Sequence, residues 1–220
     1  MLVKELIADS VPALHLHDTI FNSIQLMNDC QVLHLPLEGD GKFIGLVSEE
    51  LLLQTADETK EIHSLLESIP FFAVKQSDHF LTALQLGIEL KLSIIPIIDE
   101  ENSLTGVINY SDLLKYASEY LNVTTPGGII VLEMEHTKYS IGEICRLVET
   151  NNAQVMQLNT AFNSQTGFLQ VNIKLNKTEV AEVVAAFQRY DYQVKYYFGD
   201  ELFENELRSN YENLMNYLKI

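Results

Sequence analysis

Histidines, cysteines and carboxylates are the side chains of this sequence that could do chemistry, and their spacing gives no catalytic set. His15 and His17 would present two imidazoles on one face of a strand, but no cysteine or paired carboxylate stands at metal-ligand spacing. Cys30 and Cys145 lie far apart and are interpreted as small buried hydrophobes. The sequence contains no glycine-rich phosphate loop, GxSxG or HExxH motif. We therefore predict a protein that is not an enzyme, without a metal site or a required cofactor.

The charge balance restricts the possible partners. The 220 residues carry a formal net charge of −17, from 14 Lys plus Arg against 31 Asp plus Glu. Such a field repels nucleic acid and anionic lipid, so neither is expected as a partner. Every arginine lies after residue 120. Because arginine is the usual bidentate phosphate ligand, an anion bound before that point would depend on lysines or backbone donors.

No targeting or membrane-spanning segment is evident. There is no run of about 18 apolar residues, and the N-terminal stretch MLVKELIADS lacks the basic and apolar regions of a signal peptide. We expect a cytoplasmic protein.

Self-similarity organises the first 120 residues into two halves with one plan. Asp18 matches Asp78 and Pro36 matches Pro96 at an offset of sixty, and Gly45 matches Gly106 at sixty-one. In each half the aspartate precedes an amphipathic helix, whose expected buried faces are Ile20, Ile24 and Met27 in the first half and Leu81, Leu84 and Ile88 in the second. Two strands and a closing helix follow. The proline inside the first of these strands suggests a sheet edge or a strand end.

A third unit follows the linker candidate at residues 122–128. Strands are predicted at 129–135, 153–162, 168–175 and 192–198, with one helix that opens at 140–143 and a second at 178–190, in the ferredoxin-like order β-α-β-β-α-β. Ser140 and Glu143 form a capping-box signature. The expected buried sets are Ile141, Ile144, Cys145 and Val148 on the first helix, Val180, Val183, Val184 and Phe187 on the second, and Leu169, Val171, Ile173 and Leu175 on the third strand.

The fold class is therefore mixed, α+β or α/β. The predicted organisation is a β-α-β-β-α repeat at 1–60, a second such repeat at 61–121, a linker at 122–128, a ferredoxin-like βαββαβ domain at 129–199 and an amphipathic C-terminal helix at 200–220.

The repeated half resembles the CBS domain, most closely in the stretch Gly106–Leu114 (GVINYSDLL) and more loosely in Gly45–Leu53 (GLVSEELLL). The third unit resembles an ACT-like domain by topology. The order of the three units is similar to that of the acetoin-utilisation regulatory (AcuB-type) family. The resemblance implies two repeats related by a pseudo-twofold axis, a regulatory protein and a homodimer.

The resemblance also implies binding sites, because CBS pairs often bind adenosine-containing ligands in two clefts between the repeats. The family places a Ser or Thr three residues, and an Asp six residues, after the strand glycine; the Asp accepts hydrogen bonds from ribose hydroxyls. Asp112 holds the Asp position of the second repeat, with Asn109 at the Ser position. The first repeat keeps Ser48 but has Leu51 at the Asp position, and Glu50 is expected to point about 100° away. The preferred cleft therefore comprises Asp112, Asn109, Ser93, Ile94, Ile95 and Pro96, and the weaker one Ser48, His34, Leu35 and Pro36.

The same residues allow simpler interpretations. Asp112 suits the first turn of a helix through the helix dipole, and Ser48 and Asn109 suit helix caps. In the third unit, Tyr139 replaces the glycine of the usual ACT amino-acid site, which favours a role in dimerisation.

Two functions follow from these observations. The first is a regulatory sensor that binds AMP, ADP, ATP, NAD or S-adenosylmethionine near Asp112; Mg²⁺-bridged nucleotide or cationic S-adenosylmethionine suits the acidic chain best. The alternative is a constitutive dimeric scaffold or adaptor with vestigial clefts and an unidentified protein partner.

Overall fold

The computed structural model of the protein describes residues 1–7 and 11–199. The described residues form two compact units, which divide between Ala117 and Ser118. Residues 122–128, the predicted linker, form neither helix nor strand. The helix predicted over residues 200–220 lies outside the described residues.

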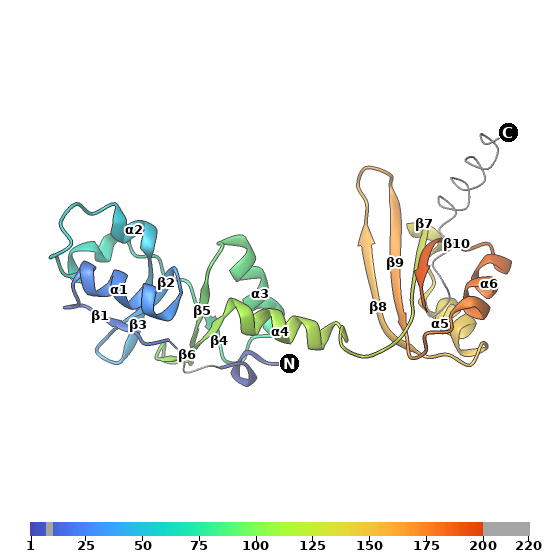
Figure 1. Ribbon diagram of the computed structural model, residues 1–220, viewed down its shortest axis with the longest axis horizontal. Coiled ribbons are helices and arrows are strands. Elements are labelled where there is room, and N and C mark those ends of the chain that lie inside the picture. The colour runs from blue at the N-terminus through green and yellow to red at the C-terminus, as the bar shows by residue number, and fades with distance from the viewer. Residues whose placement is uncertain (8–10, 200–220) are drawn as a thin grey trace, which may run out of the picture. The chain divides into compact units, whose positions relative to one another are not determined.

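The first unit contains two copies of one small sheet with its helices (Figure 1). The first copy comprises β1 (Leu14–His15), α1 (Ile20–Cys30), β2 (His34–Gly39), β3 (Lys42–Ser48) and α2 (Glu49–Leu53). The second comprises β4 (Val74–Lys75), α3 (Phe80–Glu89), β5 (Ile94–Ile98), β6 (Leu104–Asn109) and α4 (Tyr110–Tyr120). Each sheet pairs its first strand parallel and its last strand antiparallel to the strand between them. The two sheets therefore reproduce the repeat of the sequence.

The aspartate that precedes each first helix forms a turn. Asp18 Oδ2 accepts a hydrogen bond from the His15 backbone N–H at 2.7 Å, and Asp78 Oδ2 accepts one from Lys75 N–H at 2.9 Å. When an Asp side chain accepts a hydrogen bond from a backbone N–H in this way, it takes the place of a hydrogen bond between strands, and the strand ends there. The acidic residue of the repeat is explained by this local geometry.

The prolines of the repeats are not at a sheet edge, and this expectation was wrong. Pro36 and Pro96 lie within β2 and β5, which are the middle strands of their sheets. They are tolerated because the parallel neighbour is only two residues long: β1 begins its pairing at Leu37 and β4 at Ile97, one residue beyond each proline. On that side the missing N–H has no ladder partner to lose.

The buried face of α3 also differs from the expectation. Leu81 and Ile88 are 42% and 58% exposed, whereas the buried residues of α3 are Phe80, Ala83 and Gly87. These positions match the buried Ile20, Ser23 and Met27 of α1 at an offset of sixty. Gly87 has no side chain, so the pattern of apolar residues in α3 indicated the wrong helix face. Alignment of α3 with α1 at an offset of sixty indicates the observed buried face.

The segment that leads into each repeat enters the core of the other repeat. Val3 and Leu6 are buried among residues of the second repeat, and Ile62 is buried in the first. Equivalent hydrogen bonds hold both segments: Val3 N–H donates to Asp78 O, and Ile62 N–H donates to Asp18 O, each at 2.9 Å. The two repeats therefore share their cores through exchanged segments, which the predicted boundary at residue 60 does not reveal.

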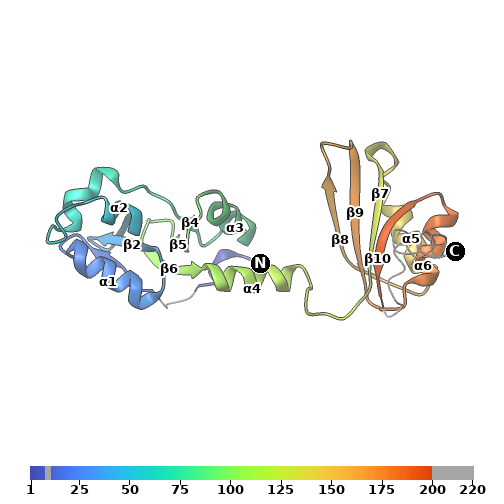
Figure 2. The ribbon, with the colours of Figure 1, turned by 45° about the horizontal axis from the view of Figure 1, so that its top comes forward.

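The second unit has the ferredoxin-like topology. It comprises β7 (Ile129–Glu135), α5 (Ile141–Glu149), β8 (Val155–Phe162), β9 (Phe168–Leu175), α6 (Ala181–Arg189) and β10 (Gln193–Phe198). The strand order is β10-β7-β9-β8, and every neighbouring pair is antiparallel. Helices α5 and α6 lie on one face of the sheet (Figure 2).

The core of the second unit confirms most of the sequence pattern. The predicted apolar sets of β9 and α6 are all buried. On α5 the prediction was wrong for Ile141, which is 54% exposed, and it missed the buried Leu147. Cys145, like Cys30, is half-buried and not fully buried as expected. Ile141 is the first residue of the helix, so the stripe that faces the sheet starts one turn later, at Ile144.

Candidate functional site

A hydrogen-bonded link joins the two repeats where β2 and β5 begin. Ser93 N–H donates to His34 Nδ1 at 3.2 Å, Ser93 Oγ lies 3.1 Å from the same nitrogen, and Leu33 N–H donates to Ser93 Oγ at 2.9 Å. Because a backbone N–H can only donate, Nδ1 must be an acceptor and the imidazole proton must sit on Nε2. Burial lowers the pKa of His34, which also favours this neutral form.

The link breaks the symmetry of the repeats. The position equivalent to His34 in the second repeat is Ile94, and the position equivalent to Ser93 in the first is Leu33. The pseudo-twofold axis would generate a second link, but its residues are apolar. The repeat pattern predicts His34 and Ser93 in different clefts, whereas the structure brings them together. No spacing rule could have indicated this contact, since the two residues occupy non-equivalent positions.

A cavity of about 560 Å³ opens beside this link. Its walls come from both repeats: from the ends of β2 and β3 and from α2 in the first, and from the residues that end α3 in the second. The volume lies within the range of small-molecule sites. The lining residues are Leu33, His34, Ser48, Glu49, Glu50, Leu53, Gln54, Leu90 and Lys91. We call this cavity the first cleft.

Ser48 and Glu50 belong to the first cleft in different ways. Ser48 Oγ accepts a hydrogen bond from Leu51 N–H at 3.2 Å and caps α2, which is the simpler role considered for it. Glu50 was discounted because it stands one residue before the family position, yet its exposed side chain lines the cavity. The signal that could have identified Glu50 is a carboxylate adjacent to the vacant Asp position, with a side chain one methylene longer.

Around Asp112 the polar candidates of the second repeat also lie close together. Asn109 Oδ1 accepts hydrogen bonds from Asp112 N–H at 3.1 Å and from Ser111 Oγ at 2.8 Å, and thereby caps α4. Ser93 O accepts a hydrogen bond from Tyr110 N–H at 3.2 Å, which holds the start of β5 against the start of α4. Asp112 itself is half-buried in the first turn of α4.

The apolar candidates lie behind the clefts. Ile94, Ile95 and Leu35 have no exposed surface, and Pro36 and Pro96 are buried. They form the strand cores that hold the polar strand ends in place. The candidate residues with accessible surface are therefore those at the strand ends and in the first turns of α2 and α4.

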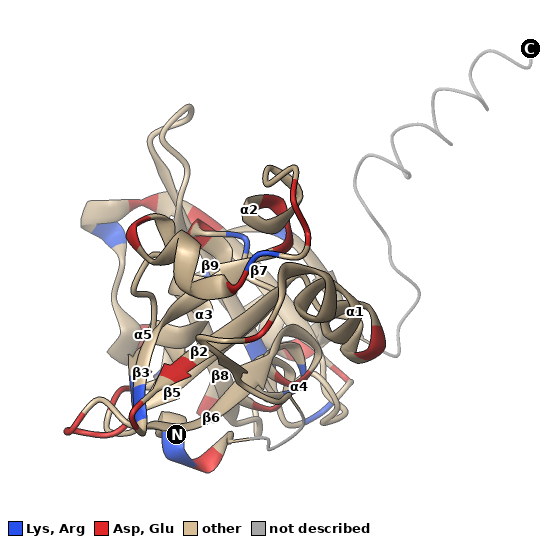
Figure 3. Cartoon of the chain, turned by 90° about the vertical axis from the view of Figure 1, so that its left-hand side faces the viewer, with Lys and Arg blue, Asp and Glu red and all other residues tan. Residues whose placement is uncertain are grey.

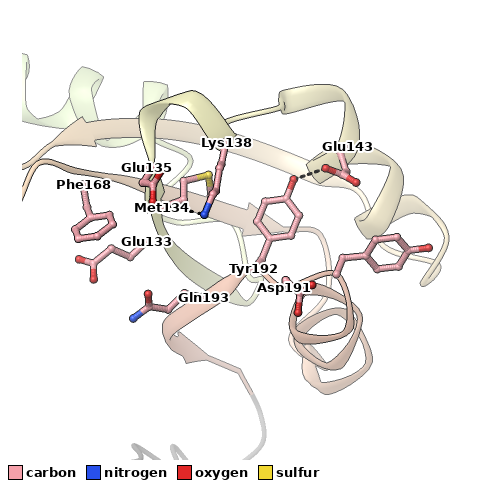
Figure 4. Close-up of a pocket in the computed structure, with 10 residues that line it drawn as sticks. Glu133, Met134, Glu135, Lys138, Glu143, Phe168, Asp191, Tyr192 and Gln193 are labelled. Atoms are coloured by element: carbon pink, nitrogen blue, oxygen red, sulfur yellow. Dashed lines mark hydrogen bonds and ion pairs between the residues drawn. The ribbon is translucent and has the colours of Figure 1, made fainter.

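The second unit has a cavity of its own, also about 560 Å³ (Figure 4). Tyr192 OH donates to Glu143 at 2.8 Å across this cavity, and burial together with Glu143 raises the pKa of Tyr192 to about 12. This bond occupies the Glu143 carboxylate that the capping-box pattern assigned to the start of α5; Ser140 Oγ does accept from Glu143 N–H, at 3.4 Å. Tyr139, which stands at the expected glycine position, packs against the core.

Charge and metal-binding capacity complete the description of the sites. Asp and Glu, red in Figure 3, outnumber Lys and Arg, blue. Among residues 1–7 and 11–199, no group of three or more His, Cys, Asp or Glu is arranged to hold a metal ion. Within the same ranges, no helix is long and apolar enough to cross a membrane.

Comparison with known proteins identifies the class. The CBS domain family model matches residues 3–57 and 64–119, which together make up half of the chain. The protein belongs to the CBS domain family.

Individual proteins resemble parts of the chain. A crystal structure of a CBS domain pair/ACT domain protein from Thermotoga maritima is 26% identical, covers 55% of this chain and 99% of that chain, and has a TM-score of 0.50. A crystal structure of CBSX2 in complex with AMP is 18% identical, covers 55% and 98% of the two chains, and has a TM-score of 0.47.

A curated enzyme also matches. The inosine-5'-monophosphate dehydrogenase of Methanocaldococcus jannaschii is 26% identical over 99 residues. The match covers 44% of this chain but only 20% of that enzyme, so the likeness does not extend to most of the dehydrogenase.

Proposed function

We propose that the protein is a non-catalytic regulator whose CBS pair binds an adenosine-containing ligand between its repeats. The observation that carries this proposal is the first cleft, a cavity of about 560 Å³ whose walls come from both repeats, beside the His34–Ser93 link. A ligand that touches both repeats can favour one arrangement of them over another. Its effect is limited by the difference in its affinity for the two arrangements.

Two acidic residues are proposed to accept hydrogen bonds from ribose, one in the first cleft and one in the cleft predicted around Asp112. Asp112 holds the family position in the second repeat, beside its partner Asn109. Glu50 reaches into the first cleft from α2. An ionised carboxylate accepts hydrogen bonds only, so it can hold both ribose hydroxyls at once.

The charge of the chain selects among adenosine compounds. With no arginine in residues 1–120, Lys91 is the basic residue among those that line the first cleft, and it shares the cavity with Glu49 and Glu50. A free nucleoside triphosphate would add negative charge to this acidic surface. A Mg²⁺-bridged nucleotide or the cationic S-adenosylmethionine is therefore the preferred ligand class.

The second unit is proposed to be an ACT-like domain that mediates homodimerisation and relays the state of the CBS pair, as in an AcuB-type regulator in the cytoplasm. The support is the ferredoxin-like strand order and the likeness to the Thermotoga maritima CBS domain pair/ACT domain protein. Tyr139 at the expected glycine position argues against the usual amino-acid site. Homodimerisation is tested by sedimentation of the full chain.

Thermal unfolding in the presence of ligands tests the sensor function. The panel contains AMP, ADP, ATP with and without Mg²⁺, NAD and S-adenosylmethionine, each with wild type, Asp112→Ala and Glu50→Ala. A ligand at about 100 times its dissociation constant adds about 2.7 kcal/mol, roughly 5–10 °C for a chain of this size. Glu119→Ala, which removes the same charge from the far end of α4, is the matched control and should behave as wild type.

The outcomes separate the two functions. A shift with one compound that is lost in Asp112→Ala or Glu50→Ala supports the sensor and identifies its cleft. A panel without any shift contradicts it and favours the constitutive dimeric scaffold with vestigial clefts.

A further inference from the structure

Both apolar and charged residues line the first cleft. Leu33, Leu53 and Leu90 are 55%, 63% and 37% exposed, although large apolar side chains are usually covered. Glu49, Glu50 and Lys91 line the same cavity, so two carboxylates and one ammonium share it with these leucines. A phosphate would leave the leucines in water and meet two like charges. A flat heteroaromatic ring would cover the leucines and leave the carboxylates to its polar substituents.

His34 supplies the first cleft with a hydrogen-bond donor of fixed direction. Its Nδ1 is committed to Ser93, which fixes the proton on Nε2. Among the described residues, no hydrogen-bond partner of Nε2 is present, and the imidazole lines the cavity. The charged groups that share the cavity with the ring are Glu49, Glu50 and Lys91. A half-buried N–H donor without a partner favours a ligand that brings an acceptor to it.

We propose that His34 is the specificity-determining residue of the first cleft, where its Nε2–H donates to a ring nitrogen of a purine base that lies against Leu33, Leu53 and Leu90. This inference rests on the proposed function and adds to it the part of the ligand that this cleft recognises. The hydrogen bond from Ser93 is the positioning contact, because it holds the imidazole in the tautomer that donates into the cleft. A ligand bound there touches the inter-repeat link directly.

Analogues that lose one ring acceptor at a time test the assignment. The probes are AMP and its three deaza analogues, in each of which one accepting ring nitrogen is replaced by C–H. Calorimetric titration uses the full chain carrying Asp112→Ala, so that binding reports the first cleft. One analogue should bind about three- to tenfold more weakly than AMP, the effect of one lost hydrogen bond. In His34→Leu on the same background, AMP and that analogue should bind equally.

Two further measurements keep the test independent of folding defects. His34→Gln retains an N–H donor, so it should restore part of the discrimination that His34→Leu loses. Long-range ¹H–¹⁵N spectra of the free wild-type chain should show His34 protonated at Nε2. A proton on Nδ1, or three analogues that all bind as AMP does, would overturn the inference.

The result also separates this inference from the proposed function. If wild type binds AMP and Asp112→Ala does not, the first cleft is not the base site, and the inference fails while the sensor stands. If wild type binds none of the adenosine compounds, both are overturned.

Discussion

Gly45, the strand glycine of the first repeat, offers a sharp test of how that repeat is packed. A methyl group at this position would lie 2.7 Å from Ile69 Cγ2 and 2.7 Å from the carbonyl oxygen of Pro70. The same oxygen accepts a hydrogen bond from Leu46 N–H at 2.9 Å. Gly45→Ala must therefore push away the segment that leads into the second repeat, and stretch the bond that holds it against β3.

The expected cost follows from these contacts. Ordinary carbon contacts lie at about 3.5–4.0 Å, so the overlap with Ile69 is on the order of 1 Å. Overpacking of this kind costs about 1–3 kcal/mol, and weakening the Leu46–Pro70 hydrogen bond adds about 1 kcal/mol. We predict that Gly45→Ala lowers the free energy of unfolding by about 2–4 kcal/mol.

Urea unfolding followed by far-ultraviolet circular dichroism measures this loss, as a lower midpoint with the slope unchanged. Gly142→Ala is the matched control, because it adds the same methyl group to a helix at a position where no atom of the described residues would lie within 4 Å. It should leave the stability unchanged or slightly raised. A Gly45→Ala protein within about 0.5 kcal/mol of wild type, a change typical of neutral surface sites, would refute the close-approach argument.

Three other predictions concern single side chains. Burial lowers the pKa of His34, so the unfolded chain binds a proton at this residue more readily than the folded chain does. The contribution of His34 to the free energy of unfolding is therefore fully present above the ordinary pKa of 6.5 and is lost as the pH falls below it. Urea midpoints compared across pH should show a smaller fall in His34→Leu than in wild type. Tyr192→Phe loses the hydrogen bond to Glu143 and about 1 kcal/mol in the same assay, and an absorbance titration should lose the phenol that ionises near pH 12. Ser48→Ala removes the cap from Leu51 N–H and costs about 1 kcal/mol, whereas Ser48→Asp should keep most of the stability; equal losses in both would contradict the capping role.

The repeat register was the strongest source of correct prediction. The offset of sixty between Asp18 and Asp78 appears in the structure as the same turn in both halves. In the second unit, the alternation of Leu169 to Leu175 predicted a strand with the observed bounds, because among residues 118–199 helices cover one side of that sheet and not the other. Such period-two patterns leave little freedom in the assignment.

The failures have a common physical cause in tertiary contacts. Leu81 and Ile88 were expected to be buried because they are large and apolar, but helix α3 approaches β5 through Gly87, where a side chain would meet Ile95 at 3.3 Å. Glu50 was discounted because helical spacing alone does not show where a cavity lies. The His34–Ser93 bond joins non-equivalent positions, so comparing the repeats could not reveal it.

The exchanged leading segments bear on how such a chain could have originated. Residues 1–60 expressed alone would carry Val3 and Leu6 without the core they enter, and would lack Ile62. Two copies of one half could supply these pieces to each other, as in domain-swapped dimers. The present chain has the geometry that duplication and fusion of such a self-complementing half would leave. Fusion ensures that one copy of each half is present in every molecule. Each half can then change in sequence without the same change in the other. An asymmetric pair such as His34 and Ser93 can arise only after that step.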